Sequence, residues 1–434
     1  MTPSFVVAAP SSGSGKTILT LGLLGAFRRA GLAVASAKIG PDYIDPRFHE
    51  AATGRPSPNL DGWSMRRDRL LSLAHEAGQG ADVMVVEGVM GLFDRAAERG
   101  VDGYGGAAEV AKTLGLPVVL VIDVGGMAQS AGAVAAGFRA FDPDVEIAGV
   151  ILNRVASARH AALSQDGCAA AGFRVFGAVP RTAGLATPSR HLGLVQAEEI
   201  EGLASILDAA AGLVADHVDL PALRDAARPL AAPPAAAPGP PARPLGSRIA
   251  LACDVAFRFA YPHLLDGWRR AGAEIMPFSP LDDEAPPVGA DAVFLPGGYP
   301  ELHAGRLAAA ARFRDGMRAA AANGVAIYGE CGGYMTLGEA IIDADGVRHE
   351  GLGLLALETS FSSRHLHLGY RRARLAAGGP LGPSGTDVRA HEFHYATILR
   401  EEGEEPLFRL QDGGRAGLRR ANVSGSFLHV LDCD

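Results

Sequence analysis

The chain has 434 residues, of which 48% are apolar and 20% are charged, proportions typical of a globular protein. This length exceeds what one ordinary hydrophobic core serves, so two domains are expected. The formal net charge of −8, without any concentrated basic face, argues against nucleic-acid binding but does not exclude an anionic small-molecule substrate.

The first half alternates short apolar runs with helical patterns. Strands are predicted at 4–10, 33–39, 82–88, 117–123, 148–155 and 176–180, and helices at 18–30, 106–114 and 129–140. Strands that are apolar on both faces and separated by helices predict a parallel sheet covered on each side.

An Ala/Pro-rich run then separates two similar halves. Because proline removes backbone donors and favours extended conformations, this run predicts a semi-rigid linker. After it, strands are predicted at 248–254, 273–278, 291–298 and 324–330, helices at 260–271 and 304–322, and a strand-rich stretch at about 352–395. The expected fold class is therefore α/β with two domains, 1–227 and 248–434, joined by the linker 228–247.

The four cysteines, at positions 168, 253, 331 and 433, lie far apart and lack metal-ligand spacing. A dense disulfide framework is thereby excluded, and a reducing compartment is the simpler context. No apolar stretch approaches the length of a membrane-spanning helix, and the apolar run 5–9 has no basic segment before it. We therefore expect a cytoplasmic protein without a membrane partner.

Residues 10–17 read PSSGSGKT between a predicted strand and a predicted helix. The Walker A pattern asks for glycine where Pro10 stands, but its closing Gly-Lys-Thr is intact. Glycines let backbone N–H groups surround phosphate oxygens, lysine reaches the β- and γ-phosphates, and threonine offers a hydroxyl to Mg²⁺. An ordinary Ser/Gly turn capping a helix is the alternative. The combined context predicts an ATP-binding loop made of Gly13, Ser14, Gly15, Lys16 and Thr17.

Polar side chains follow later strands at the same predicted sheet edge. The segment KIGPDYIDPRFH begins at Lys38, and EGVMGLFD begins at Glu87. Carboxylates beside a nucleotide loop can hold Mg²⁺, although each acid alone could instead be a solvated loop residue or a helix cap. Asn153, at the end of another strand, could read the adenine edge or satisfy its own loop. The predicted metal ligands are Thr17, Asp42 and Glu87.

In the second half, YGECGGYM places Cys331 between an apolar strand and a helical stretch. Its glycines at −2 and +2 match the sharp strand–helix turn that projects a nucleophile. A helix N-terminus would lower the thiol pKa and favour the thiolate. A buried structural cysteine is the alternative. The pattern predicts that Cys331 is a nucleophile.

Attack on an amide produces an oxyanion, which needs preorganised donors. The PGGYPE segment ends a predicted strand with two glycines, so the backbone N–H groups of Gly298 and Gly332 are the predicted donors. A general base is also required, and His429 in SGSFLH is the best candidate among 13 histidines. The H-x-H and H-E-F-H spacings at 365–367 and 391–394 lack the fuller zinc patterns, so we expect no metal there.

These motifs together resemble the cobyrinic acid a,c-diamide synthase family of corrinoid biosynthesis over nearly the whole length. The segments that carry the resemblance are PSSGSGKT, KIGPDYIDPRFH, EGVMGLFD, RHLGLVQAEE, FSPLDDE, PGGYPE, YGECGGYM, HEFHY and SGSFLH. The resemblance implies a dethiobiotin-synthetase-like P-loop domain and a class I, flavodoxin-like glutamine amidotransferase domain. It implies a glutamine-hydrolysing carbon–nitrogen ligase that amidates the a- and c-acetates of a corrin ring in cobalamin biosynthesis.

The resemblance also transfers residue roles: Cys331 is the nucleophile and His429 raises its nucleophilicity. Other class I glutaminases carry an acid two residues after the histidine, where this chain has Leu431. It therefore resembles a Cys–His dyad, and neither Glu330 nor Asp432 receives a role without geometry. The expected substrate-contacting residues are Lys38, Tyr43, Ile44, Asp45 and Asp94.

Several substrates and functions stay open. Hydrogenobyrinic and cobyrinic acid compete as substrates, and cobyric acid synthase and nickel-sirohydrochlorin a,c-diamide synthase are alternatives of the same fold. A ParA/MinD-like ATPase that binds a partner is an alternative of another class, but those proteins carry an additional P-loop lysine where Ser11 and Ser12 stand. The expected partners are a corrinoid polycarboxylate, glutamine and ATP with Mg²⁺, and a homodimer is left open.

Overall fold

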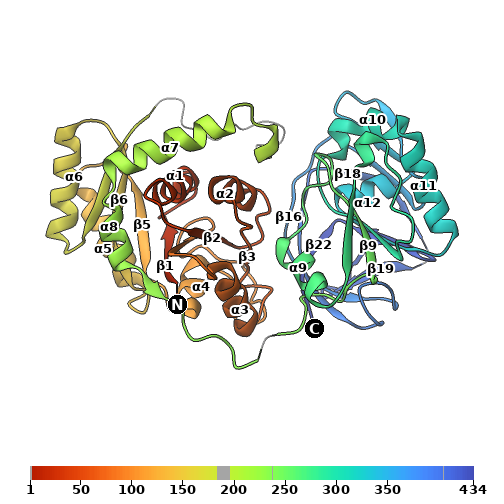
Figure 1. The fold of residues 1–434 in the computed structure, drawn as a ribbon, viewed down its shortest axis with the longest axis horizontal. Helices are drawn as coiled ribbons and strands as arrows, with labels where there is room; N and C mark the ends of the chain where they lie inside the picture. The colour runs from red at the N-terminus through yellow and green to blue at the C-terminus, as the bar shows by residue number, and fades with distance from the viewer. Residues whose placement is uncertain (1, 183–195, 237, 404) are drawn as a thin grey trace. The chain divides into compact units, whose positions relative to one another are not determined.

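The computed structural model describes residues 2–182, 196–236, 238–403 and 405–434. The chain divides into two compact units, Met1–Pro238, coloured red to light green in Figure 1, and Gly239–Asp434, coloured green to blue. This division falls within the predicted linker, whereas the domain bounds 1–227 and 248–434 stay predictions.

A central sheet organises the first unit. Its strands are β1 (Pro3–Ala8), β2 (Val34–Ile39), β3 (Asn59–Leu60), β4 (Val83–Glu87), β5 (Val118–Asp123), β6 (Ile147–Val155), β7 (Val175–Pro180) and β8 (Arg228–Pro229). The order is β3-β2-β4-β1-β5-β6-β7, all parallel, and β8 adds an antiparallel pairing to β1. The predicted parallel sheet is therefore confirmed. Since β2 lies to one side of β1 and β5 to the other, the carboxyl end of β1 is a topological switch point, where α/β sheets bind ligands.

Helices cover both faces of this sheet. They are α1 (Lys16–Arg29), α2 (Asp45–Thr53), α3 (Arg67–Gly78), α4 (Ala107–Leu114), α5 (Ser130–Phe141), α6 (Ala158–Ala170), α7 (Leu203–His217) and α8 (Leu220–Ala226), with a short 3-10 turn at Ala197–Glu199. Helices α1, α2 and α7 lie on one face, and α3 and α4 lie on the other (Figure 1).

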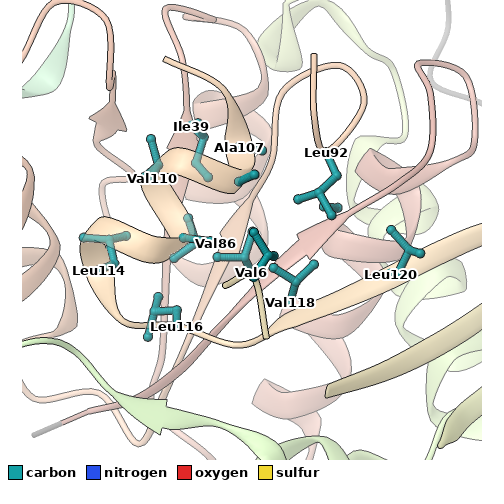
Figure 2. Close-up of a cluster of buried hydrophobic side chains, with 14 of the residues drawn as sticks. Val6, Ile39, Val86, Leu92, Ala107, Val110, Leu114, Leu116, Val118 and Leu120 are labelled. Carbon is teal, nitrogen blue, oxygen red and sulfur yellow. The ribbon is translucent and has the colours of Figure 1, made fainter. Parts of the chain in front are cut away.

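Figure 2 shows how the second of these faces is filled. Val6 of β1, Val86 of β4 and Val118 of β5 meet Val110 and Leu114 of α4, and all are buried. Because these strands are also covered on the opposite face, their side chains are apolar on both sides, which is why they read as continuous apolar runs in the sequence.

Both ends of the predicted linker pack onto a unit. Near its start, β8 pairs with β1 and the Ala231 N–H donates to the Leu114 carbonyl at 2.7 Å. Near its end, the Ala242 carbonyl accepts from the Trp268 indole at 3.2 Å, and the Pro241 carbonyl accepts from the Cys433 N–H at 2.7 Å. The segment is therefore anchored at both ends.

The second unit contains a long mixed sheet and a smaller sheet. The strands of the unit are β9 (Arg248–Ala252), β10 (Glu274–Phe278), β11 (Ala292–Leu295), β12 (Ala326–Glu330), β13 (Ala340–Ile342), β14 (Arg348–Glu350), β15 (Ala356–Ser360), β16 (His367–Leu375), β17 (Asp387–His394), β18 (Thr397–Glu402), β19 (Pro406–Leu410), β20 (Arg415–Arg420), β21 (Val423–Ser426) and β22 (Leu428–Cys433). A parallel run, β10-β9-β11-β12-β21, continues into the antiparallel run β20-β19-β16-β17-β22, and β14-β13-β15-β18 form a separate sheet.

The helices of this unit are shorter than the sequence predicts. They are α9 (Pro262–Arg270), α10 (Ala304–Ala309), α11 (Ala311–Ala322) and α12 (Gly332–Leu337), with 3-10 turns at Pro280–Asp282 and Pro300–His303. The single helix predicted at 304–322 is wrong, because Ala310 leaves the helical region at ψ 84 and divides it. Among the described residues, no helix is long and apolar enough to cross a membrane.

Two glycines of α5 give a matched test of packing. A methyl at Gly132 would lie 2.0 Å from the Gly167 carbonyl oxygen of α6, so Gly132→Ala should lower the free energy of unfolding by about 1–3 kcal/mol. A methyl at Gly137 meets no described heavy atom within 4 Å, so Gly137→Ala should raise it by about 0.5–1 kcal/mol through helix propensity. Urea unfolding of both variants measures the difference, and equal effects would contradict the close α5–α6 contact.

Candidate functional site

The loop between β1 and α1 is the phosphate-binding candidate. Gly13 and Gly15 have φ of 78° and 88°, in the left-handed region that favours glycine. A methyl at Gly15 would lie 2.3 Å from Nδ2 of Asn153, and that nitrogen donates to the Ser14 carbonyl at 2.9 Å. Asn153 thus braces the loop from the end of β6, while a contact to adenine stays a prediction.

This loop opens onto a pocket of about 440 Å³ at the carboxyl edge of the sheet. Its lining unites segments far apart in the sequence, including these predicted site residues: Gly13, Gly15, Lys16, Thr17, Lys38, Asp42, Asp45, Glu87 and Asn153. Other predicted residues lie outside the lining. Tyr43 and Ile44 are buried. The hydroxyl of Ser14 donates to the Ser11 carbonyl, and the carboxylate of Asp94 accepts from the Gly91 N–H at 2.7 Å.

A buried ion cluster forms the floor of the pocket. The Lys38 ammonium lies 2.5 Å from Asp45 Oδ2 and 3.0 Å from Glu87 Oε1. Glu87 also accepts from the Thr17 hydroxyl at 2.8 Å, and its other oxygen lies 2.7 Å from His49 Nε2. With Lys38 4% and Glu87 0% exposed, these groups are oriented by each other rather than by water.

The cluster keeps its charges. Burial alone would lower the pKa of Lys38, but the carboxylates of Asp45, Glu87 and Asp42 outweigh it and raise the pKa. Burial would raise the pKa of Glu87, but the Lys38 ammonium and the His49 hydrogen bond hold it well below its usual range. Burial and the neighbouring Asp45 raise the pKa of Asp42 to about 7. The pocket therefore presents a charged Lys38 and an ionised Glu87 together.

Lys16 is a second lysine in the pocket. Its ammonium donates to the Met90 carbonyl at 2.6 Å, and Met90 itself adopts a positive φ of 49°. Burial and the nearby Lys38 ammonium lower the pKa of Lys16. A polyphosphate would relieve both effects, because it offers this ammonium an anionic partner.

The donor set near Thr17 suits a magnesium ion, which prefers oxygen ligands. The Thr17 hydroxyl lies 2.8 Å from Glu87 and 3.5 Å from Asp45. Asp42 lines the same pocket, but its Oδ1 accepts from the N–H groups of Ile44 and Asp45 at 2.8 and 3.2 Å. Asp45 therefore contacts the Thr17 hydroxyl, although it was predicted as a substrate contact rather than a ligand.

His49 and two arginines of the pocket were not predicted from the sequence. His49 lies four positions after Asp45 on α2, so helical periodicity was a signal that could have placed both on one face. Arg154 and Arg181 line the pocket, and Arg154 pairs with Asp123. The motif RHLGLVQAEE falls largely outside the described residues, and only its segment 196–199 is described.

The second candidate site is the turn between β12 and α12. Cys331 occupies this turn with φ 46° and ψ −103°, a strained conformation for a residue with a side chain. Its N–H donates to the Ser426 carbonyl at 2.8 Å, which ties the turn to β21. A methyl at Gly333 would lie 1.9 Å from the Leu295 carbonyl oxygen, so the turn needs glycine there. The geometry matches the predicted nucleophile elbow.

The structure does not support the predicted thiolate form of Cys331. Burial, reinforced by the carboxylate of Glu301, raises the pKa of the Cys331 thiol well above its usual value. The backbone N–H of Gly332 offsets only part of this increase. The helix that follows is short, Gly332–Leu337, and its N-terminus does not outweigh the burial. The resting thiol is neutral, so attack requires a base.

The predicted oxyanion donors lie close together. A methyl at Gly332 would lie 2.9 Å from the Gly298 nitrogen, and a methyl at Gly298 would lie 2.0 Å from the Ala256 carbonyl oxygen. A methyl at the preceding Gly297 would lie 2.4 Å from Cε1 of His429. The glycine pair after β11 thus contacts both the cysteine turn and the imidazole.

His429 is fully buried on β22, opposite His391 of β17. Burial, with further contributions from His391 and His394, lowers the pKa of His429 to about 3. A neutral imidazole is the form that can accept a proton from a thiol. The thiol sulfur lies 3.8 Å from the Phe393 carbonyl oxygen, so the side chain of Cys331 faces β17.

The HEFHY segment of β17 gathers potential ligands without a metal-like arrangement. Within the described part of the chain, ligand atoms of His367, Glu392 and His394 lie within 4.8 Å of one another. The two imidazole rings stack at 4.5 Å with 7° between their planes, so their in-plane lone pairs run parallel rather than converge. Glu392 is already paired with Arg371 at 2.7 Å. We interpret the group as a stacked ion-pair cluster.

Comparison with known families agrees with these two sites. Residues 5–195 match the CobQ/CobB/MinD/ParA nucleotide binding domain, and residues 248–432 match the CobB/CobQ-like glutamine amidotransferase domain. The chain is therefore a nucleotide-binding domain fused to a glutamine amidotransferase domain, which defines a glutamine-hydrolysing amide ligase. A solved glutamine amidotransferase covers 42% of this chain and 90% of its own at 21% identity and a TM-score of 0.31, too weak a likeness to add to this.

Full-length relatives narrow the assignment. The chain is 53% identical over 436 residues to a protein from Brucella abortus, covering 99% of this chain and 98% of the relative. It is 54% identical over 430 residues to one from Rhodobacter capsulatus, covering 98% of each. Both are called hydrogenobyrinate a,c-diamide synthase. The chain belongs to the hydrogenobyrinate a,c-diamide synthase family.

The neutral His429 predicts a pH dependence of stability. Its pKa falls from the ordinary histidine value of 6.5 to about 3 on folding, so between these values unfolding takes up a proton and stability declines as the pH falls. The free energy of unfolding should decrease by up to about 1.4 kcal/mol per pH unit from this group. His429→Asn should remove this contribution to the dependence of the unfolding free energy on pH.

The measurement is urea unfolding of the second unit at several pH values between 6 and 4. Trp63 and Trp268 are the two tryptophans, so a Trp63→Phe background makes fluorescence report on Trp268. His365→Asn, at an exposed position, is the control and should leave the slope unchanged. An unchanged slope in His429→Asn would contradict a buried neutral imidazole.

Proposed function

We propose that this chain amidates the a- and c-acetate carboxylates of hydrogenobyrinic acid, using ATP and ammonia released from glutamine, in cobalamin biosynthesis. The observation that carries the proposal is the presence of both sites on one chain that aligns end to end with relatives of that name. Those names favour hydrogenobyrinic acid over the cobalt- and nickel-containing alternatives. The cytoplasmic location and a homodimer stay predictions.

The glutaminase step begins with a neutral thiol and a neutral imidazole. We infer that the Cys331 sulfur attacks the side-chain carbonyl carbon of glutamine while His429 accepts the thiol proton. The N–H groups of Gly298 and Gly332 stabilise the oxyanion. His429 then gives its proton to the leaving nitrogen, which departs as ammonia, and water hydrolyses the thioester to glutamate.

The synthetase step uses the pocket of the first unit. The P-loop backbone, Lys16 and Lys38 offer positive groups for the phosphates of ATP and for a substrate carboxylate. The γ-phosphoryl group passes to the carboxylate, giving an acyl phosphate and ADP. Ammonia then displaces phosphate and leaves an amide, and a second cycle treats the other acetate.

We propose Thr17, Asp45 and Glu87 as the residues that hold Mg²⁺, with Asp42 beside them. The support is their shared position and their oxygen chemistry. When bound there, the ion would neutralise charge on the phosphates. Lys38 currently bridges Asp45 and Glu87, so an incoming cation competes with its ammonium for these oxygens.

Lys16→Ala should remove synthesis from both glutamine and ammonium salt, because both routes need the activated carboxylate. The expected loss is about a hundredfold or more in amide formation, followed by mass spectrometry of the tetrapyrrole. Lys112→Ala, at a partly exposed lysine, is the control and should retain activity. Unchanged turnover in Lys16→Ala would refute the assignment of this loop to ATP.

Cys331→Ala should abolish glutamine-driven amidation but retain ammonium-driven amidation, because only the release of nitrogen needs the thiol. Both nitrogen sources are compared on hydrogenobyrinic acid with ATP, and glutamate release is measured in parallel. Cys253→Ala serves as the matched control. Simultaneous loss of both activities would show that Cys331 acts outside the glutaminase step.

A further inference from the structure

The proposed glutaminase needs a partner for its imidazole. Proton transfer from Cys331 to His429 creates an imidazolium in a site where burial lowers the pKa of the histidine to about 3. A buried cation without a counter-charge is strongly disfavoured. The position two residues after the histidine is Leu431, which offers no charge. Another acid must supply this role if the dyad is to work.

Glu330 has the required placement. Its Oε2 lies 3.8 Å from Nδ1 of His429, and their side chains are 2% and 0% exposed. The other carboxyl oxygen accepts from the Tyr328 hydroxyl at 3.0 Å and from the Val430 N–H at 3.1 Å. Because Val430 directly follows His429, one carboxyl group both holds the strand beside the histidine and faces its ring.

The rival acid has other partners. Oδ2 of Asp432 lies 3.6 Å from the guanidinium of Arg389, and Oδ1 accepts from the Cys433 N–H at 3.1 Å. Within the described part of the chain, three further groups lie beside His429: His391 across the β17–β22 pairing, His394, and the Tyr261 ring, whose centroid is 6.5 Å from that of the imidazole. None of those three is an acid.

We propose that Glu330 is a positioning residue of the glutaminase, which orients the His429 ring through Nδ1 and stabilises the imidazolium formed during proton transfer. This inference rests on the proposed function of Cys331 and His429. It leaves Nε2 as the atom that takes the thiol proton and returns it to the leaving nitrogen. At 3.8 Å the contact is longer than a hydrogen bond, and such contacts tighten when the substrate is bound.

Two further features support this role. Glu330 immediately precedes the nucleophile, so the strained turn that aims Cys331 also fixes the carboxylate. Burial raises the pKa of Glu330 to about 8, and an imidazolium forming on His429 would lower it again and favour the charged carboxylate. A carboxylate placed only for stability would be expected to have a basic partner, such as the one Arg389 gives to Asp432.

The test is Glu330→Gln, which preserves the size of the side chain and an oxygen acceptor for Tyr328 and Val430. The kcat for glutamine hydrolysis should fall roughly a hundredfold or more, with KM changed by less than about threefold. Ammonium-driven amidation should remain at the wild-type level. Asp432→Asn is the matched control and should retain glutaminase activity within about threefold, since we assign it no part in proton transfer.

A double-mutant cycle shows whether Glu330 acts through His429. If it does, Glu330→Gln adds little to the loss already caused by His429→Asn, whereas an independent structural effect multiplies the two losses. Glu330→Gln with wild-type or faster hydrolysis, or multiplicative losses, would overturn the inference. If Cys331→Ala and His429→Asn both keep glutaminase activity, the proposed function itself fails. That result differs from failure of the Glu330 inference alone, in which both of these variants are inactive.

Discussion

Both candidate sites depend on one backbone constraint, a residue of positive φ that directly precedes the helix following a parallel strand. In the first unit Gly15 has φ 88° before α1, and in the second Cys331 has φ 46° before α12. The turn exposes backbone N–H groups at a helix N-terminus, which suits a phosphate or an oxyanion. Contacts from other strands hold each turn: Asn153 reaches the first, and Ser426 reaches the second.

The two sites differ in the charge of their buried groups before any reaction. The first keeps Lys38 and Glu87 ionised by pairing them, because its ligands carry charge before and after the reaction. The second keeps its groups neutral: burial raises the pKa of Cys331 and lowers that of His429. Charge at the glutaminase therefore develops during the reaction rather than in the resting protein.

The sequence predicted best the features that are local. The strands β1 and β12 and the turns after them follow from short apolar runs that end in glycines, so Lys16 and Cys331 could be named directly. Features set by distant contacts were harder to predict. The break at Ala310, the anchored linker and the neutral thiol all depend on packing partners far along the chain.

The difference between local and distant contacts also explains why the roles of the acidic residues were hard to predict. Sequence spacing shows that Asp42 and Asp45 follow one strand, but only folding directs the first toward backbone N–H groups and the second toward Thr17. Likewise, Glu330 and Asp432 are both near catalytic candidates in the sequence, yet one faces an imidazole and the other a guanidinium. The role of a carboxylate is decided by what its oxygens meet, since a buried charge is stable only beside a partner. In the proposed glutaminase step that partner becomes a cation only when the thiol gives up its proton, so the proposed interaction strengthens along the reaction path, as transition-state stabilisation requires.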